Sequence, residues 1–192
     1  MHWIAMIGGL VFTATVLAEE LPAGDPVEGR AIASACRACH GPDGYARVAN
    51  APHIGGEDAA YIANQMIAYR DGTRRHAAMS LVARRLDNQA IADVAAWYAS
   101  HRVSTRMTRP APEAPEQCTA CHGADGIATI RNAPHIAGEA SVYIATQLKA
   151  YKSGKRVNAV MSDIAAMLTD DEIRSIANWY SAVDLTIESP GN

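Results

Sequence analysis

The chain has 192 residues, of which 49% are hydrophobic and 19% are charged. This composition is sufficient for a packed core, and it excludes disordered, collagen-like and disulfide-dense proteins. Seventeen Lys and Arg against twenty Asp and Glu leave a net charge of -3. We therefore expect no nucleic-acid partner, because such partners require a basic surface.

The chain begins with a short apolar run, residues 4–17, that ends in small residues before Glu19. This pattern predicts a signal peptide over residues 1–18, cleaved after Ala18, and therefore an exported protein. The alternative is an uncleaved membrane anchor. Cleavage is favoured because the run is shorter than the roughly 20 residues that span a bilayer. Export exposes free thiols to oxidation, so all four cysteines should be committed to a structural or chemical role.

The rest of the chain contains an internal repeat of 82 residues. Residues 36–98 align without a gap on residues 118–180, with 32 identities in 63 positions. The repeat predicts two modules of about 80 residues, and a core of that size usually needs a cross-link, metal or cofactor.

The module boundaries follow from this repeat and from three prolines. We expect one domain over residues 19–102 and a second over residues 116–192. Residues 103–115 should form the linker between them, because Pro110, Pro112 and Pro115 interrupt helices and stiffen an extended chain.

Helix signals begin at Asp25, which is a candidate N-cap followed by Pro26 at the first helical position. Glu28 completes a capping-box pattern, and the helix should run into Cys36. The second copy should lack most of this helix, because Pro115 lies only three residues before its first cysteine.

Each module should contain two further helices. The middle helices should end at Gly72 and Gly154, and the last helices should begin at Asp87 and at Thr169, where Glu172 completes a capping box. No stretch shows the alternation of a β-strand. The prediction is an all-α fold with three helices in each module around a bound group.

The same five-residue motif opens both copies. It reads Cys36-Arg37-Ala38-Cys39-His40 in the first and Cys118-Thr119-Ala120-Cys121-His122 in the second. Two thiols three positions apart followed by His are typical of covalent attachment of haem c, with the His as an iron ligand. A four-cysteine zinc site and redox disulfides are alternatives. They are disfavoured because the His follows both pairs and no βαβ pattern is present.

Met79 and Met161 are the predicted sixth ligands of the two irons. Each lies 39 residues after its motif His, in the predicted loop between the middle and last helices. A thioether ligand raises the potential of a His-ligated haem and closes the iron to other ligands. The alternative role of a Met is to fill the core, and Met66 and Met167, which have no Met partner in the other copy, fit that role.

His53 and His135 also repeat, and they are rival ligands that would make bis-His sites. Their position only 13 residues after the motif His places them on the proximal side, where supporting groups belong. A surface or propionate hydrogen bond is the alternative. The carbonyls of Pro52 and Pro134 should accept hydrogen bonds from Nδ1 of the motif histidines and fix the rings. Otherwise these are ordinary loop prolines.

Four more repeated residues are expected around the haems. Arg74 and Arg156 could neutralise haem propionates, although solvated surface positions are nearly as consistent with the sequence. Tyr61 and Tyr143 should form part of the haem-pocket wall.

Together these motifs resemble those of the dihaem class I cytochromes c of the cytochrome c4 type. The resemblance covers the mature chain through the paired Cys-x-x-Cys-His motifs, the Ala-Pro-His-Ile segments, the Tyr-x-x-x-Gln helices, Gly-x-Arg and the Met-Ser loops. It implies two tandem cytochrome c-like domains with two covalently bound haem c groups, related by a pseudo-twofold. His40 and Met79 would ligate one iron, and His122 and Met161 the other.

The resemblance also implies a function. Such proteins carry electrons in the periplasm from a bc1-type complex or a periplasmic dehydrogenase to a terminal cytochrome oxidase or another acceptor, often in association with the membrane. An alternative is a dedicated electron-accepting subunit of a sulfide, thiosulfate or alcohol dehydrogenase. A catalytic haem enzyme is a third reading, disfavoured because the ligand set is complete. The chain departs from many relatives in its Gly-Glu, where they have Gly-Gln, and in the short start of its second copy.

Overall fold

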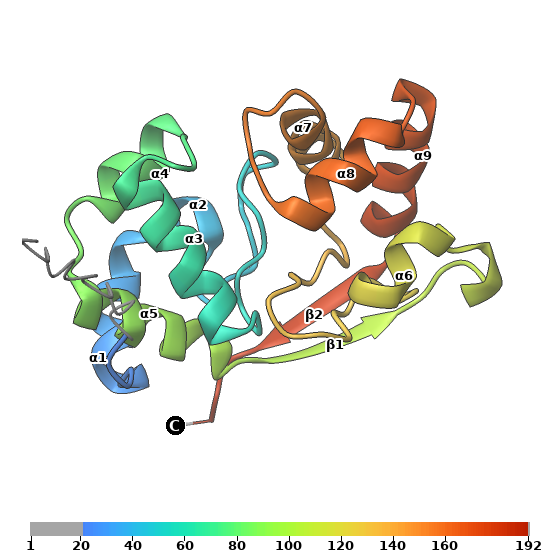
Figure 1. The fold of residues 1–192 in the computed structure, drawn as a ribbon. Helices are drawn as coiled ribbons and strands as arrows, with labels where there is room; N and C mark the ends of the chain where they lie inside the picture. Colours follow the sequence, from blue (N-terminus) through green and yellow to red (C-terminus); the bar gives the residue numbers. More distant parts are fainter. Residues whose placement is uncertain (1–20, 192) are drawn as a thin grey trace, which may run out of the picture.

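The computed structural model describes residues 21–191, so the predicted signal peptide of residues 1–18 lies outside it. Two helical modules lie side by side, and the second lies above a two-stranded sheet that starts beside the last helix of the first (Figure 1). The elements of the first module are α1 (Pro26–Ile32), η1 (Ala33–Ala35), α2 (Arg37–His40), α3 (Ala59–Asp71), α4 (Ala77–Ala83) and α5 (Asn88–Ala99), followed by β1 (Arg102–Arg106). Those of the second are η2 (Ala111–Glu113), α6 (Glu116–His122), α7 (Ser141–Lys152), α8 (Ala159–Met167) and α9 (Asp170–Ser181), followed by β2 (Asp184–Glu188).

The start of α1 confirms part of its prediction. The Asp25 side chain accepts a hydrogen bond from the Val27 N–H, and Pro26 is the first helical residue. The predicted capping box is wrong, because the Asp25 N–H donates to Asp93 Oδ1 of α5 at 2.7 Å rather than to Glu28. This bond fixes the first helix of the module to its last. The second module begins at α6 without an equivalent of α1, as predicted.

The middle and last helices begin and end close to the predicted residues. Helix α3 ends at Gly72, which adopts a left-handed conformation with φ of 81°. Helix α5 is capped by Asp87, whose side chain accepts from the Ala90 N–H. At the start of α9, Thr169 and Glu172 form the predicted capping box. These local signals are therefore sufficient to place the helices that enclose each core.

The segments that carry Met79 and Met161 are helical, which corrects the prediction of loops. Met79 lies in α4 and Met161 in α8. The ring of His76 accepts the Met79 N–H in one module, and Asn158 Oδ1 accepts the Met161 N–H at 3.0 Å in the other. A side-chain cap therefore replaces a missing helical hydrogen bond directly at each methionine.

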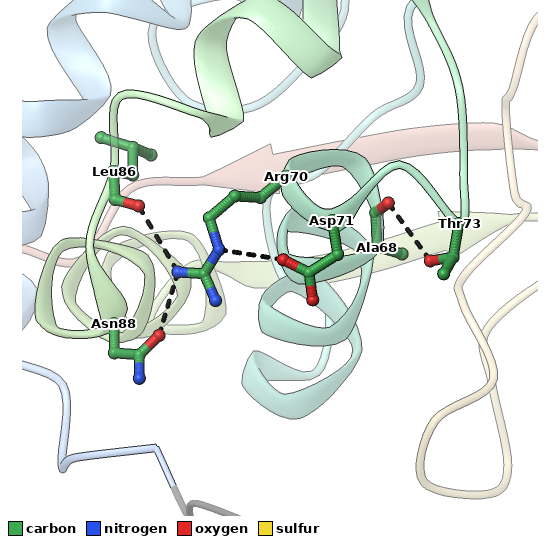
Figure 2. A network of polar contacts seen from close by, with 6 residues as sticks. All are labelled: Ala68, Arg70, Asp71, Thr73, Leu86 and Asn88. Atoms are coloured by element: carbon green, nitrogen blue, oxygen red, sulfur yellow. Dashed lines mark hydrogen bonds and ion pairs between the residues drawn. The ribbon is translucent and has the colours of Figure 1, made fainter.

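A cationic side chain joins the two ends of the methionine segment, the stretch of chain that carries α4 and Met79. Arg70 at the end of α3 donates to the Leu86 carbonyl at 3.5 Å and to Asn88 Oδ1 at 2.9 Å, at the start of α5 (Figure 2). In the second module Lys152 takes the equivalent place and donates to the Leu168 carbonyl. Both ends of each methionine segment are therefore held together.

The all-α fold class is confirmed, but two short strands correct the expectation that no stretch forms a β-strand. β1 and β2 pair in antiparallel fashion, with Arg102 opposite Glu188 and Arg106 opposite Asp184. The sequence signal was weak because each strand has five residues and its partner lies about 80 positions away. The fold is nonetheless mostly helical, and the sheet joins the modules (Figure 1).

The sheet packs against glycines in both modules. A Cβ on Gly56 would lie 2.3 Å from the Val103 side chain, and one on Gly138 would lie 2.9 Å from that of Leu185. Both glycines have positive φ, so the loops approach the sheet in a conformation that few other residues adopt. The predicted linker of residues 103–115 thus begins as a strand of the sheet that joins the modules.

The last helix of each module is covered by a different part of the chain. In the first module α1 packs on α5, and Arg30 lies over the Trp97 ring at 5.4 Å. In the second, residues of the predicted linker pack on the core, and Arg109 lies over the Trp179 ring at 5.7 Å. The linker therefore substitutes for the missing helix. Within residues 21–191, no helix is long and apolar enough to cross a membrane.

Gly29 allows α1 to approach α5, and its replacement should destabilise the first module. A Cβ at this position would lie 2.0 Å from the Asp93 carbonyl oxygen. We expect Gly29→Ala to lower the free energy of unfolding by about 1–3 kcal/mol, because the two helix backbones must move apart. Denaturant unfolding measures the loss. Val27→Ala, at an exposed position of the same helix, is the control, and equal stability of the two variants would contradict the packing argument.

Candidate functional site

One cavity between the modules is lined by predicted site residues from both copies of the repeat. They are Cys36, His40, Pro52, Tyr61, Arg74, Met79, Cys118, His122, Pro134, Tyr143, Arg156 and Met161. Of the remaining predicted residues, Cys121 lines an adjoining pocket of the second module and Cys39 is exposed. The repeat therefore builds one shared space with two equivalent sets of groups.

The motif histidines are oriented by backbone carbonyls. His40 ends α2 and His122 ends α6, and both side chains are buried. Nδ1 of each ring donates to the carbonyl of Pro52 or Pro134, at 2.9 Å in both modules. Because a carbonyl can only accept, Nδ1 carries the proton and Nε2 keeps a free lone pair. Burial lowers the pKa of both rings, which favours the neutral form that binds iron.

The two methionines line the cavity together with these histidines. Met79 and Met161 are half-buried and pack on the two cores. Met66 is buried in the first core, as predicted for a filler. The same prediction is wrong for Met167, which is 77% exposed at the end of α8. Iron ligation by Met79 and Met161 remains a prediction that this arrangement permits.

The four cysteines form no disulfide, and the two motif pairs lie in separate modules. Burial raises the pKa of the Cys118 thiol to about 11 and also raises that of Cys36, which favours the protonated thiols before a haem is attached. Within residues 21–191, no three His, Cys, Asp or Glu side chains come together as a zinc site requires. The two motifs are therefore placed for two separate attachments at the edge of the cavity.

His53 and His135 connect the modules instead of facing an iron. In His53, Nδ1 accepts the Ala46 N–H at 2.9 Å, so Nε2 carries the proton and donates to the Gly138 carbonyl at 3.1 Å. His135 repeats this arrangement with Ala128 and, across the interface, with the Gly56 carbonyl at 3.0 Å. Both ring nitrogens of each His are occupied, which argues against the bis-His alternative.

Two buried glutamates, which were not predicted as site residues from the sequence, complete these contacts between the modules. Glu139 Oε1 accepts the His53 N–H at 2.8 Å, and Glu57 Oε2 accepts the His135 N–H at 3.1 Å. The signal that could have found them is the repeated Pro-His-Ile-x-Gly-Glu segment. Burial raises the pKa of Glu57 to about 8 and that of Glu139 well above its usual range.

A second polar cluster crosses the interface. Gln65 Oε1 accepts hydrogen bonds from Arg74 and Arg156, and Gln147 Oε1 accepts from the same two side chains, with cross-module distances of 3.0 Å. Arg156 also donates to the Tyr61 hydroxyl at 3.3 Å. The arginines are thus part of the wall between the modules rather than solvated surface residues.

The positive charge of the two arginines suits a ligand that carries carboxylate groups. Neither Arg74 nor Arg156 forms an ion pair with a carboxylate in the described part of the chain. Arg156 is only 8% exposed, and a buried cation of this kind requires an anion or strong hydrogen bonds. The propionates of haem are such anions. The mainly apolar cavity, the two oriented imidazoles and the paired thiols also fit the porphyrin.

The interface histidines make the stability of the protein depend on pH. Burial lowers the pKa of His53. The contribution of His53 to the free energy of unfolding is therefore complete above the ordinary histidine pKa of about 6.5, and it is lost as the pH falls below that value. We expect His53→Asn to lower the free energy of unfolding by about 1–3 kcal/mol at neutral pH and to weaken its dependence on pH between about 5 and 7. Denaturant unfolding at several pH values measures both effects.

His76→Asn is the matched control for this experiment. His76 caps α4, and Asn158 already performs the same task in α8. The control should keep the acid dependence that His53 contributes. An identical acid dependence in His53→Asn and the natural protein would contradict the assignment.

Comparison with known proteins identifies the family to which the chain belongs. A profile of the family described as cytochrome C oxidase, cbb3-type, subunit III matches residues 106–179. The chain is 32% identical to cytochrome c4 of Pseudomonas aeruginosa over 180 residues, which cover 84% of this chain and 90% of that relative. It is also 32% identical to the thiosulfate dehydrogenase electron acceptor of Stutzerimonas stutzeri (strain A1501), over 79% of this chain and 80% of the relative.

Solved structures of related proteins have the same fold as this chain. The crystal structure of reduced recombinant cytochrome c4 from Pseudomonas stutzeri superposes with a TM-score of 0.74 at 25% identity, covering 84% of this chain and all of the other. Thiosulfate dehydrogenase from Marichromatium purpuratum gives 0.71 at 29% identity, over 83% of this chain and 40% of the larger one. The chain therefore belongs to the cytochrome c4 family and is an electron-transfer protein with covalently bound haem c.

Proposed function

We propose that the protein binds two haem c groups, one in each module, and carries electrons singly between redox proteins in the periplasm. The observation that supports this most directly is the single cavity lined by two equivalent pairs of His and Met. A one-haem protein would need only one of these sets. With one haem, the second pair of His and Met would have no function.

Each haem would be held by four residues of its own module. The thiols would bond to the porphyrin, and the His and Met would ligate the iron. These residues are Cys36, Cys39, His40 and Met79 in the first module and Cys118, Cys121, His122 and Met161 in the second. When bound, the haem iron supplies one-electron chemistry by alternating between the ferric and ferrous states.

The protein itself controls how that chemistry proceeds. The carbonyls of Pro52 and Pro134 fix the imidazole rings, which sets the direction of the iron ligand. As iron ligands, the neutral thioethers of Met79 and Met161 would stabilise the ferrous state and leave no position for oxygen or peroxide. The apolar lining excludes water. These properties suit a carrier rather than a catalyst.

The shared arginine cluster would act on both haems. Arg74 and Arg156 would neutralise propionates, and Tyr61 and Tyr143 would line the pocket walls. Because Gln65 and Gln147 bind both arginines, the cations of the two modules are held at one place in the interface. The acidic edges of both haems would therefore face a common counter-charge, which favours a close approach of the two groups.

The partners are redox proteins. As donor we propose a bc1-type complex or a periplasmic dehydrogenase, and as acceptor a terminal cytochrome oxidase, with peripheral association with the membrane. A second candidate role is that of dedicated acceptor for thiosulfate dehydrogenase, since two similar proteins carry that description. Rapid reduction by purified thiosulfate dehydrogenase and slow reduction by a bc1-type complex would favour the second role.

A haem assay tests the central claim. We expect two haems per chain, both low-spin, with the weak red band of methionine-to-iron coordination and no response to carbon monoxide. Visible spectra of the exported protein in both oxidation states provide the measurement. One haem per chain, or binding of carbon monoxide by the natural protein, would contradict the proposal.

The methionine assignment has a separate test. We expect Met161→Ala to keep both haems, to lower the potential of one of them and to let carbon monoxide bind there, because its sixth ligand is lost. Spectroelectrochemical titration and carbon monoxide difference spectra measure these changes. Met167→Ala is the control, since this exposed methionine lies six residues further along the same helix. Unchanged spectra in Met161→Ala would refute the assignment.

A further inference from the structure

Glu57 and Glu139 occupy equivalent positions in the loops that precede α3 and α7, and they lie in the wall of the shared cavity. Their exposed fractions are 4% and 2%. Each accepts one backbone N–H from the opposite module, so the pair spans the interface. Glu139 Oε2 is buried without a hydrogen-bond partner among the described residues. A carboxylate in that state needs either a cation or a proton.

No cation satisfies this requirement in the described part of the chain. Neither glutamate takes part in an ion pair there. The nearby titratable and charged groups are Asp58 and His135 beside Glu57, His53 and Tyr143 beside Glu139, and Arg74, Arg156 and Tyr61 in the same cavity. His53 and His135 face the carboxyls through backbone N–H groups and have neutral rings. Two buried acids from opposite modules therefore lie in the wall of the same cavity without an ion-pair partner.

Burial of both acids, together with the negative charge of a neighbouring carboxylate, then favours protonation. Burial is the main reason that the pKa of Glu57 rises to about 8, and the proximity of Glu57 further raises the pKa of Glu139. Two acids that share a buried site release their protons in separate steps that belong to the pair. The pair can therefore change its protonation near neutral pH.

We propose that Glu57 and Glu139 form a proton-binding site shared by the two modules, and that uptake of an electron by a haem in the cavity is coupled to uptake of a proton by this pair. The inference rests on the haem occupancy proposed above. It assigns to the protein a second transferred particle, the proton, with the glutamates as its acceptors.

The coupling follows from electrostatics. One electron makes the cavity more negative by one charge, and in a poorly solvated interior that charge acts strongly on a nearby acid. The neutral form of the carboxyl is then favoured. In balance, a ferric haem and one electron from a redox partner give a ferrous haem, while one carboxylate and one proton from water give one carboxylic acid. Oxidation reverses both changes.

The structure suggests a conservative test variant. Each glutamate needs only one acceptor oxygen for its bond across the interface, and the amide oxygen of Gln can provide it. Glu57→Gln and Glu139→Gln should therefore keep the interface while removing the titration. Glu28→Gln, at an exposed position of α1, is the matched control for charge.

The experiment measures midpoint potentials of the haem-loaded, full-length protein from about pH 5 to pH 9, a range that brackets the titration of the pair. In the natural protein we expect the potentials to fall as the pH rises, with a slope that approaches one proton per electron in part of this range. The double variant should lose this slope, and Glu28→Gln should keep it. Potentials independent of pH in the natural protein would overturn the proposal.

Infrared difference spectra between the reduced and oxidised states identify the group that takes the proton. A carbonyl band of a protonated carboxyl should appear on reduction and be absent in the double variant. An unchanged band and slope in that variant would assign the proton to the haem propionates and overturn the proposal. If the double variant fails to fold, the two single variants must each shift the band.

Haem content and the methionine-to-iron band are recorded first for every variant. A natural protein that lacks them would refute the proposed function. Intact haem spectra with potentials that do not depend on pH would refute only the role of the glutamates.

Discussion

The reciprocal hydrogen bonds between the two modules are the constraint on which the rest of the structure depends. Each Pro-His-Ile-x-Gly-Glu loop places its His ring on a carbonyl of the other loop and its carboxyl on a backbone N–H of the other loop. The same loops carry the proline carbonyls that orient the motif histidines. The interface and the supports of the two motif histidines are therefore one structural unit, and a change in one would alter the other.

Duplication has preserved this unit while its surroundings have diverged. Lys152 replaces Arg70 at the base of the methionine segment, and Asn158 replaces His76 as the helix cap. In each case a different side chain satisfies the same backbone group. The first helix is missing from the second copy, and the chain that enters that copy covers its core instead. Physical roles have thus been conserved more strictly than residue types.

The sequence was sufficient to predict contacts within a module but not those between modules. The caps at Asp25 and Thr169 and the carbonyl of Pro52 depend on residues close in the chain, so spacing alone revealed them. His53 and Glu139 were different, because an internal repeat shows the same pattern whether a contact lies within one copy or between two. The strands escaped prediction for a similar reason: each is stable only beside a partner in the other half of the chain.

The position of β2 sets the order in which the molecule can be assembled. This strand is the last element of the chain, and it pairs with β1 directly after the first module. During synthesis the first module can fold before β2 exists, whereas the sheet can form only when residues 184–188 have emerged. Loss of a few residues at that end would remove the strand and spare both cores. The outcome would be two intact modules that keep the hydrogen bonds between their loops but lose the sheet, so the final strand provides a second, separate connection between them.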